Sequence, residues 1–546
     1  MTFFPATDAI AGSSILSALT GILPLLLFFV LLGVFKLPTH LCAIGSLILA
    51  SLIAWLGFEM PLPLVANSAL YGFSFGLTPI VFIVVAAVWL YNLTVSSGRA
   101  DDVRSVFSMV GKGDMRLQAL LVGFSFCGLL EGLAGFGAPV AIVAAMLVSF
   151  GIAPLKAAVV TLVGNAINVC FGAMAIPLTT AGTIGGLEGS VVASTAATIT
   201  PIIATFIPLL LLFILDGIRG VKQLWFVAVV QGFVTACGHF IAANFISYEL
   251  TAVFASLLGF AVVAGFLQFI NPSTPEEWRS VAATSKPGTK DLVLGLMPYW
   301  LVVIVFGVAK LWRIGIDLPA ALSSTDIILQ WPGLYGHLIA ADGSQSQGAL
   351  FKLQTLASPG TMIVFTALIV SFVYGLYGKT EKYSYSFGRG IKELWKTIYT
   401  LRISLLTIAL VMSLAYVMNF SGQTIAIGAA LAATGSAFGF LSPILGWIGT
   451  AVTGSATSSN ALFASMQSTA AQGAGIDPQL LLAANSIGGG TGKIVSPQTL
   501  AIAATAVNKP GLESEMLQKA APWSAGLLFI LCCLIFSATQ GWLPFL

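Results

Sequence analysis

The stretch GGGTGKIVSP, residues 488–497, places Lys493 among four glycines and a proline inside otherwise apolar sequence. Glycine has no Cβ and loses the most backbone freedom in a helix, and proline has no N–H to donate. This backbone is therefore a poor candidate for a continuous helix. The stretch predicts a chain that unwinds at its glycines, with one full positive charge at the interruption.

The composition places this interruption in a membrane. Of 546 residues, 58% are hydrophobic and only 8% are charged, whereas about a quarter of the residues in a soluble domain are charged. Apolar runs such as 14–35 and 521–543 exceed the roughly 20 residues that a helix needs to cross a bilayer. We expect a single domain, 1–546, that is an all-α polytopic membrane protein with about ten to fourteen transmembrane segments.

Charged residues cluster between the apolar runs and predict the topology. The segments 99–116 and 379–402 are rich in Lys and Arg, and the positive-inside rule places them in the cytoplasm. The stretch 313–352 is polar but poor in Lys and Arg, and the first thirteen residues have neither. We expect both to lie outside, and we expect no cleaved signal peptide because the basic region that it needs is missing. The net charge of +3 gives no reason to expect a nucleic acid partner.

The chain also resembles itself. Two series of residues follow the same order: GIAP (151–154), Asn165, Gly172 and Pro177, then GIDP (475–478), Asn485, Gly492 and Pro497. Upstream of them lie EGLAGFGAPVA (131–141) and TGSATSSNALFA (453–464). We expect two repeats, about 117–215 and 403–508, whose relative orientation the residues leave open. Hydrophobic segments interrupted by Gly or Pro at corresponding places in two halves indicate the binding site of a transporter. The alternative is that these glycines only pack helices.

The interrupted segments predict an anion site. Irregular backbone at membrane depth must be buried in protein or line a wet cavity, and a helix that begins there presents N–H groups and the positive end of its dipole. The candidate substrate-binding residues offer ammonium, hydroxyl, amide or bare backbone groups at the interruptions: Lys493, Thr457, Ser458, Ser459, Asn460, Asn165, Asn485, Gly135, Gly137, Gly492 and Ser496. Lys493 is either the charge beside an anionic substrate or a structural partner of Glu131.

Glu131 is the candidate proton carrier. It follows the apolar segment 117–130, where an ionised carboxylate is costly and a protonated one is not. The alternative is a carboxylate that caps the start of a helix.

The sequence gives little support for an enzyme. It has no H-E-x-x-H motif, and its three histidines are scattered. The glycine-rich stretch is not a P-loop, because Ile487 stands where the first glycine belongs and Ile494 follows the lysine. The six cysteines form no CxxC pair. We expect no metal and no cofactor, and a transporter is favoured over a membrane-embedded enzyme or a channel.

At these motifs the sequence resembles the bacterial lactate permease family. The similar segments are EGLAGFGAPVAI (131–142), FGAMAIP (171–177), SPILGWIGTAVTGSATSSNALFA (442–464) and GGGTGKIVSPQTLAIA (488–503). The resemblance covers essentially the whole chain. It implies a secondary transporter of the bacterial inner membrane that imports L-lactate, D-lactate and glycolate with protons. It also implies inverted repeats, each with a re-entrant hairpin and a broken helix, and an elevator-like movement, and it allows a homodimer.

One departure from the family concerns coupling. Many members read T-G-S-D-T-S-S-N where this chain has TGSATSSN, so Ala456 stands where they have Asp. Either Glu131 carries the proton here or the coupling differs, and sodium held by unwound carbonyls is an alternative. The substrate alternatives are another small carboxylate or a dicarboxylate. A dicarboxylate would favour two cationic contacts, and the motifs hold only Lys493.

Overall fold

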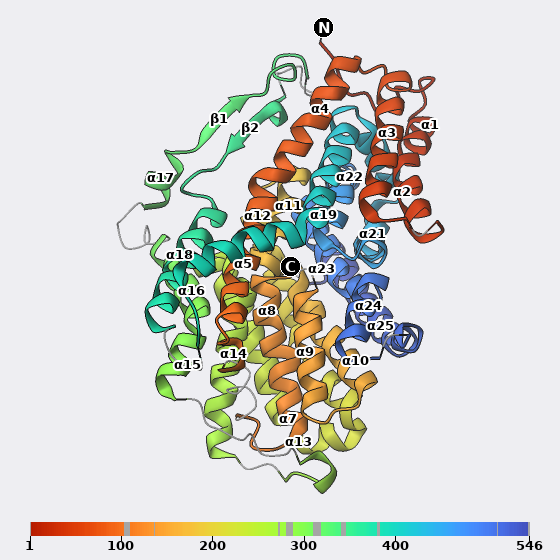
Figure 1. Ribbon diagram of the computed structural model, residues 1–546. Helices are drawn as coiled ribbons and strands as arrows, with labels where there is room; N and C mark the ends of the chain where they lie inside the picture. The colour runs from red at the N-terminus through yellow and green to blue at the C-terminus, as the bar shows by residue number, and fades with distance from the viewer. Residues whose placement is uncertain are drawn as a thin grey trace.

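The computed structural model is a dense bundle of helices with a short β-hairpin at one end (Figure 1). It describes residues 2–35, 37–102, 110–135, 137–270, 273–279, 288–309, 318–339, 346–378, 383–509 and 511–543. Within these residues, eleven helical segments are long and apolar enough to cross a membrane. A pair bent by 53°, α15 (Thr289–Gly295) and α16 (Met297–Ala309), brings the number to twelve if the pair is counted as one span. The expected all-α polytopic membrane protein is confirmed. Parts of the loops used for the topology lie outside the described residues: 103–109, 310–317, 340–345 and 379–382.

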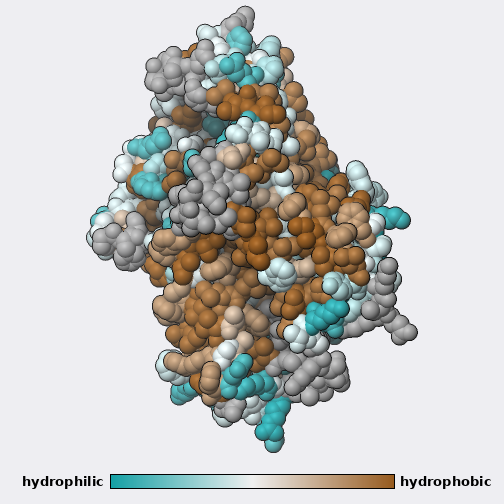
Figure 2. All heavy atoms as spheres, turned by 90° about the vertical axis from the view of Figure 1, so that its left-hand side faces the viewer, coloured by the Kyte–Doolittle hydropathy of each residue, from teal (hydrophilic) through white to brown (hydrophobic). Residues whose placement is uncertain are grey.

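The outer surface suits a lipid environment. Figure 2 shows one face of the molecule on which hydrophobic side chains form a broad band, with hydrophilic residues mainly towards the two ends. Large apolar side chains such as Ile15, Phe206 and Phe269 are exposed on the bundle. A soluble monomer rarely exposes a contiguous apolar patch of this kind, so lipid is the medium that these side chains fit.

Several of the N-terminal helices pack against one long helix of the second half, α19 (Phe387–Phe420). They are α1 (Ser14–Gly21), α2 (Leu23–Gly33), α3 (Thr39–Leu56), α4 (Leu62–Phe75), η1 (Gly76–Val81) and α5 (Phe82–Ser96). Helices α3, α4 and α5 all contact α19. Pro38 and Pro61 stand at the N-caps of α3 and α4, where the missing N–H breaks no helical bond.

The first predicted repeat contains two interruptions. Its elements are α7 (Met115–Leu120), η2 (Leu121–Phe126), α8 (Cys127–Leu133), α9 (Ala138–Ser149), α10 (Pro154–Asn165), η3 (Ala166–Phe171), α11 (Gly172–Gly185) and α12 (Gly189–Ala204). The chain breaks between α8 and α9 at Gly135 and Gly137, whose φ values of 45° and 88° suit glycine. The second interruption opens α11, where Ala173, Met174 and Ala175 have φ values of 44°, 60° and 57°. Left-handed backbone costs an L-residue about 1–2 kcal/mol, so the surrounding packing must hold these residues, as is common at functional sites.

The middle of the chain connects the repeats. Its elements are α13 (Ile207–Ile241), η4 (Ala242–Ile246), η5 (Tyr248–Leu250), α14 (Thr251–Phe269), η6 (Glu276–Trp278), α15, α16, α17 (Leu318–Ser323), β1 (Ile327–Gln330), η8 (Gln347–Ala349), β2 (Leu350–Leu353) and α18 (Pro359–Tyr377). Strands β1 and β2 pair antiparallel. Helix α13 is broken at Gly217 (φ 61°, ψ −151°). Arg116 donates to Asp216 at 2.9 Å and Lys156 donates to the carbonyl of Leu215 at 2.6 Å, so two cations of the first repeat hold this break.

The second predicted repeat has interruptions at the corresponding motifs. After α19 come α20 (Gln423–Ala432), η9 (Gly435–Ala437), α21 (Phe438–Thr453), α22 (Ala456–Ala474), α23 (Pro478–Lys493), α24 (Pro497–Ala506) and α25 (Glu513–Thr539). The break between α21 and α22 falls at Gly454, which has a φ of 72°. The break between α23 and α24 covers residues 494–496. The inverted relation of the repeats and the re-entrant path of their hairpins stay predictions.

The expectation that the glycines before Lys493 unwind the chain is wrong. Helix α23 continues through Lys493. A Cβ added at Gly490 or Gly492 would lie 2.3 Å from the carbonyl oxygen of Ala166 or Trp447, respectively. These glycines therefore let α23 pack directly against neighbouring backbone, which is the packing alternative, and the interruption follows the lysine.

Candidate functional site

A buried ion pair joins the two repeats beside their interruptions. Lys493 donates from Nζ to Oε1 of Glu131 at 2.7 Å. Asn165 donates from Nδ2 to Oε2 of the same carboxylate at 2.8 Å. Lys493 is 6% exposed and the other two residues are each 2% exposed, so water solvates this charge pair poorly. Lys493 ends α23 and Glu131 lies near the end of α8, so the pair connects segments that are far apart in sequence.

Gly172 makes room for the Glu131 carboxylate. A Cβ added at Gly172 would lie 2.8 Å from Oε1 of Glu131, whereas one added at Gly135 would lie 3.6 Å from it, an ordinary contact distance. Gly172 is the glycine of the Asn–Gly–Pro series in the first repeat. A side chain at Gly172 would therefore push Oε1 away from Lys493.

A second buried network engages the other predicted amides. Asn460 donates to the carbonyl of Pro177 at 2.8 Å and accepts from Asn485 at 2.7 Å. Ser459 donates to a backbone carbonyl of α21 at 3.1 Å. These bonds tie α22 to α11, α21 and α23, so Ser459, Asn460 and Asn485 bond to the protein itself and hold the interrupted helices together.

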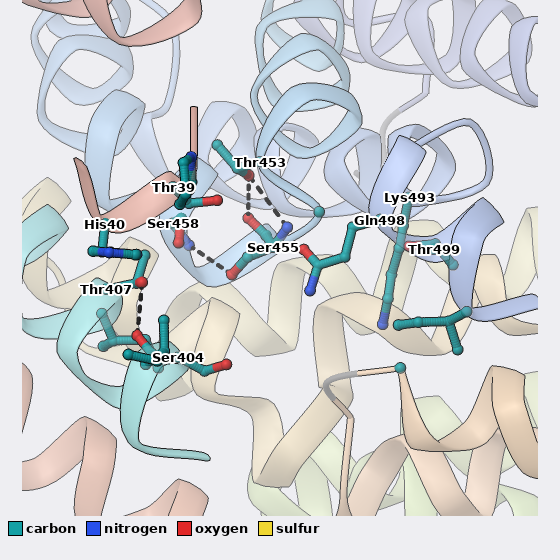
Figure 3. Close-up of a pocket in the computed structure, with 16 residues that line it drawn as sticks. Thr39, His40, Ser404, Thr407, Thr453, Ser455, Ser458, Lys493, Gln498 and Thr499 are labelled. Atoms are coloured by element: carbon teal, nitrogen blue, oxygen red, sulfur yellow. Dashed lines mark hydrogen bonds between the residues drawn. The ribbon is translucent and has the colours of Figure 1, made fainter. Parts of the chain in front are cut away.

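A cavity of about 320 Å³ opens beside Lys493, a size that falls in the range of small-molecule sites, about 300–1,000 Å³. Four helices, α3, α9, α22 and α24, begin at its wall (Figure 3). Gly137 and Ser455 are the N-caps of α9 and α22, and Gln498 and Thr499 lie in the first turn of α24. Each helix start carries about half a positive charge. Together with the lysine they make a site for a small anion.

The opposite wall of the cavity comes from α3 and α19. Thr39 and His40 belong to the first turn of α3, and Ser404 and Thr407 belong to α19. Figure 3 shows these side chains across the cavity from Lys493. A ligand in the cavity therefore lies between the helix starts of the two repeats and the N-terminal helix group.

A smaller pocket of about 40 Å³ also contains Lys493 in its wall. It is lined by Glu131, Gly135, Ala456 and Thr457 among others. Its volume is far below the roughly 300 Å³ at which small-molecule sites begin, so the larger cavity is the better fit for a carboxylic acid. Among the described residues that line the two pockets, Glu131 is the one carboxylate. Ala456 adds no charged group to this pocket.

Six of the twelve predicted site residues line these two pockets. The lining members are Lys493, Glu131, Gly135, Gly137, Thr457 and Ser458. Ser496 instead caps α24 by accepting from the N–H of Thr499, and Gly492 packs against α21. Sequence reasoning missed Ser455, Gln498 and His40. The first two stand directly beside an interruption, which was the available signal, whereas nothing near His40 in the sequence marks it.

The chain has extensive similarity to known transport proteins. Residues 17–540 match the family described as L-lactate permease. Over 526 residues the chain is 38% identical to the glycolate permease GlcA of Escherichia coli, with 92% of each chain covered. In an alignment 564 residues long, gaps included, it is 35% identical to the L-lactate permease of Bacillus subtilis, and the alignment covers 98% of each chain. The L-lactate permease of Escherichia coli is 37% identical, with 93% of each covered. Among solved structures, the YdaH transporter of Alcanivorax borkumensis aligns with 87% of this chain and 88% of its own, at 14% identity and a TM-score of 0.44.

Proposed function

The chain belongs to the L-lactate permease family, and from that membership we propose that it is a secondary active transporter that imports lactate and glycolate with protons across the bacterial plasma membrane. Relatives named for lactate and for glycolate cover nearly the whole chain. Both compounds are small 2-hydroxymonocarboxylates, so we assign L-lactate, D-lactate and glycolate to one site. The basic segments 99–116 and 379–402 face the cytoplasm in this proposal, and the N-terminus lies outside.

The observation that carries the proposal is the meeting of four helix N-termini with Lys493 at one cavity. A carboxylate at this place accepts a charge-assisted hydrogen bond from the ammonium group and gains from the helix dipoles. Of the described lining residues, Lys493 is the one lysine or arginine. A single compensating charge suits a monocarboxylate better than a dicarboxylate.

Proton coupling follows because Glu131 and the substrate share Lys493 as a partner. The carboxylate of Glu131 and that of the substrate compete for one ammonium group. When the substrate takes Lys493, an ionised Glu131 would keep only Asn165 as a partner, and breaking a buried pair in this way costs about 3–5 kcal/mol. Uptake of a proton by Glu131 removes this cost. Substrate binding therefore favours protonation of Glu131, and by linkage protonation favours substrate binding.

The substrate assignment is tested by uptake of radiolabelled L-lactate into proteoliposomes that contain the purified protein. Unlabelled glycolate and D-lactate should compete with the label, and succinate should not. Competition by succinate at the same concentrations as lactate would instead indicate a dicarboxylate site.

A further inference from the structure

Gln498 is a polar side chain of the large cavity on the same wall as Lys493. Within the part of the chain that the structure describes, its amide makes no hydrogen bond. Two hydroxyl groups nearby are engaged, because Thr453 donates to backbone carbonyls and Thr499 bonds to another hydroxyl. Ser455 accepts from a backbone N–H of α22 but keeps its own proton to donate, and the Ser458 hydroxyl makes no hydrogen bond within the described residues. In Figure 3, Gln498 lies between these two serines and Lys493, so Gln498 is the available donor and acceptor on the lysine side.

The backbone is shaped to admit this amide. Gly454 has a φ of 72°, and a Cβ added there would lie 2.4 Å from Oε1 of Gln498. Any side chain at Gly454 would thus displace the amide. In Figure 3 the Gln498 side chain lies between Ser455 and Lys493. The interruption at residues 494–496 brings Gln498 and Lys493 to one cavity from two different helices.

We infer that Gln498 binds the 2-hydroxyl group of the substrate while Lys493 holds its carboxylate, and this inference rests on the function proposed above. A carboxylate only accepts hydrogen bonds and an ammonium group only donates them, so these two match. A hydroxyl donates one hydrogen bond and accepts others, and a glutamine amide offers a carbonyl acceptor and an NH₂ donor. Ile502, one helical turn beyond Gln498, lines the same cavity and offers apolar surface to the carbon chain.

Other polar groups of the site are less suited to this role. Ser459 and Asn460 bond to backbone carbonyls and to Asn485 in the second network. His40 and Ser404 lie across the cavity from Lys493. A hydroxyl on the carbon next to the carboxylate stays close to the carboxylate, so its partner must stand on the lysine side of the cavity.

The inference predicts how a substrate without the hydroxyl behaves. Propionate cannot make this hydrogen bond, and because Gln498 is exposed in the open cavity, water takes the place of the missing hydroxyl. The net gain of one hydrogen bond then corresponds to about two- to twelvefold in binding. Wild-type protein should therefore need about two to twelve times more propionate than unlabelled lactate to halve the uptake of labelled lactate. In Gln498→Leu, which presents no polar group to either acid, this ratio should fall to about one, chiefly because lactate binds more weakly.

Gln479→Leu is the matched control. Gln479 is also the second residue of a helix that begins with proline, but it lines a different cavity, so its variant should keep the wild-type ratio. Gln498→Met, an unbranched side chain of similar length, should behave like Gln498→Leu and guards against a local packing defect. An unchanged ratio in both Gln498 variants would overturn the inference and leave lactate transport standing. A wild-type protein that takes up no lactate would overturn the proposed function itself, and the inference with it.

Discussion

Replacing Lys493 with alanine should reduce both stability and substrate binding, by two routes that can be separated. The variant removes the 2.7 Å contact at Oε1 of Glu131 and leaves only the Asn165 contact of 2.8 Å at Oε2. Glu131 is 2% exposed, so solvent replaces the lost partner only poorly. A buried charge stranded in this way costs about 3–5 kcal/mol, and Lys493→Ala should unfold at a clearly lower temperature.

The double variant Lys493→Ala, Glu131→Gln separates the two routes. In this variant, the neutral glutamine at position 131 can still accept a hydrogen bond from Asn165. Most of the stability lost with the stranded charge, about 3–5 kcal/mol, should therefore return. Lactate binding should not return. A hydrogen bond to a charged group contributes about 1.5–3 kcal/mol, which corresponds to roughly 10- to 150-fold weaker binding.

Thermal unfolding of the purified protein and calorimetric titration with lactate measure the two quantities. Lys396→Ala, which removes a lysine whose side chain is 72% exposed, controls for the loss of one positive charge and should change neither. If the double variant regains both its stability and the wild-type lactate affinity, Lys493 serves only as the partner of Glu131 and does not contact the substrate.

Three further predictions concern coupling, packing and topology. Glu131→Gln should abolish proton-driven lactate accumulation but keep lactate exchange, because it removes the titratable group and leaves Lys493; accumulation that persists would exclude the proton role. Gly492→Ala puts a Cβ 2.3 Å from a backbone oxygen and should destabilise the protein by about 1–3 kcal/mol in thermal unfolding. The control Gly526→Ala adds a Cβ where nothing lies within 4 Å and should not destabilise the protein. If Gly492→Ala melted at the same temperature as the wild-type protein, the packing role would be refuted. In a cysteine-free protein, Ser324→Cys should react with an impermeant maleimide from outside and Ser384→Cys should not; the opposite pattern would invert the topology.

The membrane fold could be predicted because its signal is local. Runs of apolar residues and the scarcity of charge identify spanning helices without any knowledge of their neighbours. The breaks near Gly137, Gly454 and Pro497 could be predicted too, since glycine and proline mark them in the sequence. The exact end of α23 could not, because it depends on whether backbone from other helices comes within 2.3 Å of Gly490 and Gly492. That contact is tertiary, and the same glycines would suit an unwound chain.

The site was predicted in its residue types more than in its geometry. Lys493 and Glu131 were expected either to pair or to act separately, and the pair forms across 362 positions of sequence. Nothing local decides between such alternatives. The amides Asn460 and Asn485 were expected near the ligand. Instead, Asn485 donates a hydrogen bond to Asn460, and Asn460 donates one to a backbone carbonyl. Gln498 could not be identified as a site residue from the sequence, because polar residues are common in the first turn of a helix and the cavity beside it is a tertiary feature.

The most direct test of coupled transport imposes the pH gradient and the sodium gradient separately on proteoliposomes that contain the wild-type protein. An inward proton gradient alone, at equal sodium on both sides, should drive uptake of labelled lactate above its equilibrium level. A protonophore should then collapse it. An inward sodium gradient at equal pH should drive no accumulation. Accumulation driven by sodium, with none driven by protons, would contradict the role given to the Glu131–Lys493 pair.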